Sequence, residues 1–116
     1  MSILIAEDNL AQRTYLRELL EREFKKYGPM LEAPDGETVV KLALEHHPQL
    51  CILDIQMPGL SGVKAAKAIW KSFPDARVIF WTQFPHEIYI NEIRKLVRSV
   101  EPNPAYGFID KNNPES

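Results

Sequence analysis

The 116-residue sequence predicts a single α/β domain, residues 1–116, in which helices cover both faces of a parallel sheet. Two observations support this prediction. Short, nearly continuous apolar runs, such as residues 50–53 and 78–81, are typical of strands that are buried on both faces. Stretches with apolar residues at helical spacing separate these runs, and the alternation of strand and helix is typical of a parallel sheet.

Five strands are expected, and each is ended by polar or turn-forming residues: 2–6, 30–33, 50–53, 78–81 and 106–109. Four helices are expected between them. Asn9 and Ser61 are candidate N-caps of the first and third helices, Gly28-Pro29 ends the first, and Pro85 begins the fourth. The apolar positions of the four helices are Leu10, Leu16, Leu19, Leu20, Phe24 and Tyr27; Val39, Val40, Ala43 and Leu44; Ala65, Ala66, Ile69 and Phe73; and Ile90, Ile93, Leu96, Val97 and Val100.

A sheet covered on both faces requires one more helix after the fifth strand. Residues 112–116, Asn-Asn-Pro-Glu-Ser, have the composition of a helix cap and first turn. We therefore expect the 116 residues to lack the final helix, and to be the front part of a longer protein or a shortened chain.

The composition excludes several classes of protein. Hydrophobic residues make up 45% and charged residues 26%, as in ordinary globular proteins. With 14 basic and 16 acidic residues the chain lacks the basic character of nucleic-acid binders, so no direct nucleic-acid binding is expected. The sequence contains neither a signal peptide nor an apolar run of the roughly 20 residues that cross a bilayer, which predicts a cytoplasmic location and no membrane partner. The single cysteine, Cys51, is predicted to be a core residue.

Polar residues follow four of the predicted strands. The C-terminal ends of parallel strands lie at one edge of the sheet, where such proteins bind ligands. That edge would bring together Glu7, Asp8, Asp54, Thr82 and Lys111. Crowded carboxylates repel one another unless a cation neutralises them, and Mg²⁺ prefers oxygen ligands. An aspartate can also attack phosphorus, while a metal ion, an ammonium and a hydroxyl stabilise the phosphoryl oxygens.

Each of these residues also has a simpler interpretation. Asp54 opens a turn or caps a helix, Asp8 with Asn9 caps the first helix, Thr82 is an ordinary strand-end hydroxyl, and Lys111 is a solvated surface charge. Other conspicuous residues are assigned no site: Trp70 and Trp81 as packing residues, His46 and His47 as surface residues at a helix end, and His86.

Five motifs stand out along the chain: residues 3–9 with their acidic pair, 33–36, 53–62, Thr82 after an apolar strand, and 107–111. Together they resemble the receiver domains of two-component response regulators. The likeness covers nearly the whole chain. It implies a flavodoxin-like three-layer sandwich with a five-stranded parallel sheet of order 2-1-3-4-5. The closing segment most resembles the subfamily that carries a helix-turn-helix output domain, so transcription is the expected output.

The resemblance also implies roles for individual residues. Asp54 would accept a phosphoryl group from the phosphohistidine of a sensor histidine kinase. Glu7, Asp8 and Asp54, together with the backbone carbonyl of Gln56, would hold Mg²⁺. The protein would be a signalling switch rather than an enzyme, since it would catalyse only its own phosphorylation and dephosphorylation.

In the same scheme, Thr82 and Lys111 would bind the phosphoryl group, and Phe108 would reorient together with Thr82 on activation. The face formed by the fourth helix and the fifth strand would contact an output domain or a second copy of the chain. Three features depart from the family pattern. Gln83 replaces a small residue, which predicts slow phosphoryl exchange; Asn112 replaces a proline, so no cis bond is expected there; and residues 101–105 form an extra loop near the signalling face.

Three other functions fit the sequence less well. A metal-dependent phosphatase or hydrolase with an aspartate nucleophile would usually need a second carboxylate where Gln56 stands, and a lid. A flavodoxin-like cofactor binder would need a phosphate-binding loop where Glu7 and Asp8 stand. A pseudo-receiver that is never phosphorylated is disfavoured by the intact set of five polar residues.

Overall fold

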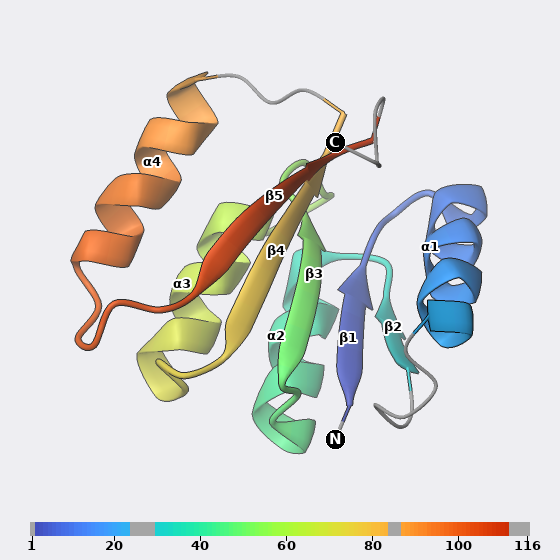
Figure 1. Ribbon diagram of the computed structural model, residues 1–116, viewed down its shortest axis with the longest axis horizontal. Coiled ribbons are helices and arrows are strands. Elements are labelled where there is room, and N and C mark those ends of the chain that lie inside the picture. Colours follow the sequence, from blue (N-terminus) through green and yellow to red (C-terminus); the bar gives the residue numbers. More distant parts are fainter. Residues whose placement is uncertain (1, 24–29, 84–86, 112–116) are drawn as a thin grey trace.

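A computed structural model describes residues 2–23, 30–83 and 87–111. In these residues five strands alternate with four helices: β1 (Ile3–Ala6), α1 (Leu10–Glu23), β2 (Met30–Ala33), α2 (Gly36–His46), β3 (Leu50–Asp54), α3 (Gly62–Ser72), β4 (Arg77–Thr82), α4 (Glu87–Arg98) and β5 (Tyr106–Asp110). All strand pairs are parallel, and the sheet order is β2-β1-β3-β4-β5 (Figure 1). The predicted fold and its strand order are therefore confirmed.

The core consists of two clusters, one on each face of the sheet. The larger cluster joins β-strand residues such as Leu53 and Phe80 to α2, α3 and α4. The smaller cluster joins Ile5 and Trp81 to Leu16 and other apolar residues of α1. Because successive side chains of a strand point to opposite faces, Phe80 and Trp81 lie in different clusters. The chain thus forms the predicted three layers.

The helix starts follow the expected capping chemistry. The side-chain oxygen Oδ1 of Asn9 accepts the Gln12 N–H at 3.0 Å, and Oγ of Ser61 accepts the Lys64 N–H at 3.3 Å. The predicted caps Asn9 and Ser61 are confirmed. Cys51 is fully buried, and this burial raises the pKa of its thiol to about 12. Its predicted place in the core is also confirmed.

Two of the apolar residues that mark the helices do not join the core, since Leu10 is 66% exposed and Leu44 is 44% exposed. Leu10 is the first residue of α1 and precedes the turn that packs on the sheet. On a helix, neighbouring residues point about 100° apart, so the burial of Ala43 turns Leu44 toward solvent. Several predictions fall outside the described residues: Phe24, Tyr27, the stop at Gly28-Pro29, the start at Pro85, the bond after Lys111 and the missing final helix.

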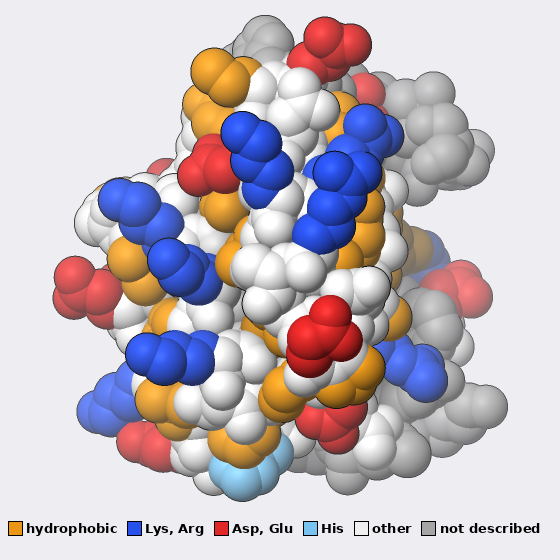
Figure 2. Space-filling model, turned by 90° about the vertical axis from the view of Figure 1, so that its left-hand side faces the viewer, with side chains coloured by type: hydrophobic (Ala, Val, Ile, Leu, Met, Phe, Trp, Pro, Cys, Tyr) orange, Lys and Arg blue, Asp and Glu red, His pale blue; other side chains and the backbone are white. Residues whose placement is uncertain are grey.

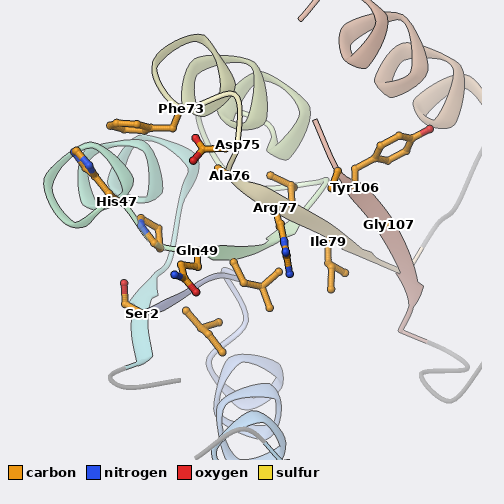
Figure 3. A pocket seen from close by; sticks show the side chains of 15 residues that line it. Ser2, His47, Gln49, Phe73, Asp75, Ala76, Arg77, Ile79, Tyr106 and Gly107 are labelled. Atoms are coloured by element: carbon orange, nitrogen blue, oxygen red, sulfur yellow. The ribbon is translucent and has the colours of Figure 1, made fainter. Parts of the chain in front are cut away.

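A depression with a volume of about 1000 Å³ lies at the N-terminal edge of the sheet. Figure 3 shows its lining, with His47 and Phe73 on one side and Tyr106 on the other. The His47 and Phe73 rings are in contact, with their centroids 4.0 Å apart. The depression lies at the opposite edge of the sheet from the polar strand ends.

None of the described helices is long and apolar enough to cross a membrane.

Candidate functional site

The polar strand ends meet at the C-terminal edge of the sheet. The register pairs Ala6 with Leu53, Asp54 with Trp81, and Thr82 with Asp110, so the residues at these ends lie side by side. Together they line a second, open depression of about 320 Å³, whose lining is Glu7, Asp8, Asn9, Gln12, Asp54, Gln56, Thr82, Gln83 and Lys111. All five residues predicted from the strand ends are in this set.

Three carboxylates form an acidic cluster in the depression. Glu7, Asp8 and Asp54 each offer an oxygen, and these oxygens lie within 4.8 Å of one another. Partial desolvation, followed by the nearby Glu7 carboxylate, raises the pKa of Asp8 above its ordinary value. Among the described residues, the lining offers oxygen ligands and contains neither histidine nor cysteine. This donor set fits Mg²⁺, which takes oxygen ligands and would relieve the repulsion.

Lys111 is the cation that faces this cluster. Its Nζ donates to Glu7 Oε1, to Asp54 Oδ2 at 3.0 Å and to Gln12 Oε1 at 3.0 Å. The Lys111 backbone N–H donates to the Thr82 carbonyl at 2.8 Å, which fixes the start of the side chain. Only 8% of the Lys111 side chain is exposed, so the interpretation as a solvated surface charge was wrong.

The loop after β3 holds Asp54 in place. The Gln56 N–H donates to Asp54 Oδ1 at 3.1 Å, and the Gly62 N–H donates to the Ile55 carbonyl at 2.9 Å. A Cβ on Gly62 would lie 2.1 Å from the Asp54 carbonyl oxygen, so only glycine allows this approach of α3 to the end of β3. The loop therefore fixes one carboxylate oxygen of Asp54 and leaves the other on Lys111.

The remaining predicted residues occupy two places. Thr82 is buried at the end of β4, in the lining beside Gln83. Phe108 lies on the face of the sheet that α4 covers, with its ring centroid 5.7 Å from that of Phe80. The exposed side chain of Gln56 reaches α4, where its Nε2 donates to Tyr89 Oη at 3.0 Å. The site is thus linked directly to α4, a contact that the sequence did not predict.

Trp81 and Gln12 are further members of the site that sequence reasoning missed. Trp81 packs in the core as predicted, but its indole Nε1 also donates to Glu7 Oε1 at 3.2 Å. Gln12 accepts from Lys111 and lies in the first turn of α1. The position of Trp81 next to Thr82 was the available signal for the first residue, and the short interval from Asp8 to Gln12 was the signal for the second.

Comparison with known protein families gives a match to the response regulator receiver domain over residues 3–113. The chain belongs to the response regulator receiver domain family. Oxygen regulatory protein NreC of Staphylococcus epidermidis is 34% identical over 116 residues, which are 99% of this receiver domain and 50% of that protein. NreC of Staphylococcus carnosus is 32% identical over 117 residues. The chain therefore spans half the length of these curated relatives.

Solved structures agree with this assignment. A DNA-binding response regulator of the LuxR family from Staphylococcus aureus is 29% identical, with a TM-score of 0.66 over 92% of this receiver domain and 84% of that chain. Chemotaxis protein CheY4 of Vibrio cholerae is 20% identical and shares the fold, with a TM-score of 0.81 over 98% of this chain and 89% of that one.

Proposed function

We propose that this receiver domain accepts a phosphoryl group on Asp54 from a sensor histidine kinase. The observation that carries the proposal is the position of Asp54 Oδ2, 3.0 Å from Lys111 Nζ in an open depression that also holds Glu7 and Asp8. In the transfer, an Asp54 oxygen forms a bond to phosphorus as the bond from phosphorus to the histidine nitrogen breaks. The nitrogen keeps the electron pair, and Asp54 becomes an acyl phosphate.

Glu7, Asp8 and Asp54, with the Gln56 backbone carbonyl, are the residues that would hold Mg²⁺. When bound, the ion supplies positive charge that offsets the negative charge of the phosphoryl oxygens. In the phosphorylated state, Lys111 Nζ would exchange its hydrogen bond to Asp54 Oδ2 for one to a phosphoryl oxygen. The Thr82 hydroxyl, at the neighbouring strand end, donates to another. Gln83, an exposed residue of the lining, would slow exchange of the phosphoryl group.

The signal would leave the site through β5 and α4. Thr82 moves toward the phosphoryl group, Phe108 reorients with it, and the Gln56 to Tyr89 hydrogen bond connects the same site to α4. Figure 2 shows Lys and Arg side chains gathered on the side of the molecule where α4 lies, and α4 exposes Arg94, Lys95 and Arg98. This α4 and β5 face would contact an output domain or a second copy of the chain.

The output is proposed to be transcription. The relatives that support this proposal are NreC, named as an oxygen regulatory protein, and the LuxR-family regulator from Staphylococcus aureus, named as DNA-binding. In such a protein the receiver domain is a switch, whose own chemistry is limited to gaining and losing the phosphoryl group.

Intact-protein mass spectrometry after incubation with acetyl phosphate and Mg²⁺ tests the proposal. We expect the wild-type chain to gain the mass of one phosphoryl group and to gain none when EDTA replaces Mg²⁺. Asp54→Asn should gain none, whereas Asp75→Asn, which changes an exposed aspartate at the opposite edge of the sheet from the acidic cluster, should behave as wild type. An adduct of equal yield on Asp54→Asn contradicts the proposal.

A further inference from the structure

A buried tryptophan, Trp81, donates a hydrogen bond to the acidic cluster from the core side. The indole Nε1 of Trp81, in β4, donates to Oε1 of Glu7, which follows β1, although the two residues are 74 positions apart. Both are buried, with 3% of Trp81 and none of Glu7 exposed. The Trp81 ring lies in the core beside α1, and the Lys111 Nζ is 5.9 Å from the ring centroid. Core packing therefore holds the indole in place, and the Lys111 ammonium lies over its ring.

The donors around Glu7 determine which of its oxygens can reach a cation. Oε1 accepts from both Trp81 Nε1 and Lys111 Nζ. Oε2 accepts from the Asn9 N–H at 3.1 Å. A carboxylate oxygen has two lone-pair positions, so these contacts fill Oε1 and leave one position on Oε2. The indole N–H thus helps to set the rotation of the Glu7 carboxylate about the Cγ–Cδ bond.

We propose that Trp81 is a positioning residue of the metal site, which keeps Glu7 oriented with Oε2 available to Mg²⁺ or to a water bound to it. This inference rests on the proposed function. The hydrogen bond from Trp81 to Glu7 becomes more important in the phosphorylated state, because Lys111 then turns from Glu7 to the phosphoryl group. Trp81 cannot follow, since its ring is fixed in the core, and its N–H remains on Glu7.

The chain offers a matched control in its other tryptophan. Trp70 is also buried, and its Nε1 also donates one hydrogen bond, to the Ala76 carbonyl at 2.9 Å. Its ring packs on the opposite face of the sheet, against Phe80. Trp70→Phe and Trp81→Phe therefore remove the same atoms and one hydrogen bond each, but only Trp81→Phe removes a donor to the acidic cluster.

Calorimetric titration with Mg²⁺ tests the inference without any phosphoryl donor. A hydrogen bond to a charged acceptor is removed while other donors remain, so we expect Trp81→Phe to bind Mg²⁺ about three- to tenfold more weakly than wild type. With acetyl phosphate, its adduct should need more Mg²⁺ for half-formation and reach the wild-type yield at saturation. Trp70→Phe should match wild type in both. Equal Mg²⁺ affinity of the two variants overturns the inference.

Tryptophan fluorescence separates this inference from the proposed function. In Trp70→Phe, Trp81 is the one remaining tryptophan of the two in the chain. Adding Glu7→Gln to that variant, without metal, should shift the emission maximum, because a negative charge next to the indole nitrogen is lost; no shift overturns the inference. If wild type binds no Mg²⁺ while the shift is present, the proposed function fails and the metal-positioning role of Trp81 fails with it. If wild type binds Mg²⁺ as tightly as Trp81→Phe does, only the role of Trp81 fails.

Discussion

Lys111→Met is expected to destabilise the fold, because Lys111 is the cation between two buried carboxylates. Its Nζ makes three hydrogen bonds, to Glu7, Asp54 and Gln12. Removing one partner of a buried ion pair typically costs about 3–5 kcal/mol of unfolding free energy. Glu7 keeps the N–H groups of Trp81 and Asn9, so we expect a loss near the lower value, about 3 kcal/mol.

Urea unfolding followed by circular dichroism measures this loss. With a slope of about 2 kcal/mol per M, the midpoint should fall by roughly 1.5 M. Mg²⁺ should restore much of the stability, since a ligand at about 100 times its dissociation constant adds about 2.7 kcal/mol. Lys67→Met, on the exposed side of α3, should unfold as wild type. A loss below about 1 kcal/mol for Lys111→Met, or an equal loss for both variants, would refute the reasoning.

Three further substitutions give distinct expectations. The pKa of Asp8 is raised above 3.8, so the ionised carboxylate lowers the free energy of unfolding at neutral pH. Asp8→Asn should therefore be more stable than wild type at neutral pH, by less than about 1 kcal/mol, because water screens this exposed group. Urea midpoints of the two proteins, measured at decreasing pH, should converge below pH 3.8. Gly62→Ala places a Cβ 2.1 Å from the Asp54 carbonyl oxygen and should cost about 1–3 kcal/mol of unfolding free energy. Gly107→Ala adds a Cβ in open space and should not lower the free energy of unfolding in this way. Equal urea midpoints of the two variants would argue against a tight approach of α3 to β3. Gln83→Ala should shorten the lifetime of the phosphoryl adduct in a mass-spectrometric time course, and an unchanged lifetime would exclude Gln83 as the barrier to exchange.

Much of the architecture follows from local patterns in the sequence. Apolar runs bounded by turn residues locate the strands to within about one residue, because strands buried on both faces need continuous apolar sequence. Parallel pairing then requires the strand ends to share an edge, so the sequence alone predicts that Glu7, Asp54 and Thr82 lie together, as they do in the lining of the acidic depression. The strand order came from family resemblance, since periodicity does not determine which strands pair.

Other features depend on three-dimensional contacts that no local pattern encodes. Composition marks Trp81 as a core residue, which it is, but nothing in a window around it indicates that its N–H reaches Glu7. The contact between Gln56 and Tyr89 depends on how α4 packs, and the burial of Lys111 depends on the depth of the depression. Lysine is usually exposed, so the general expectation for this residue type favoured the wrong interpretation.

The central claim is that the phosphoryl group is carried by the Asp54 carboxylate, and borohydride trapping tests it most directly. Borohydride reduces an acyl phosphate to an alcohol, which marks the phosphorylated residue in a peptide map. After incubation of the wild-type chain with acetyl phosphate and Mg²⁺, we predict that the reduced residue is found at position 54. Reduction at Glu7, at Asp8 or at any other carboxylate, with Asp54 unmodified, would contradict the account.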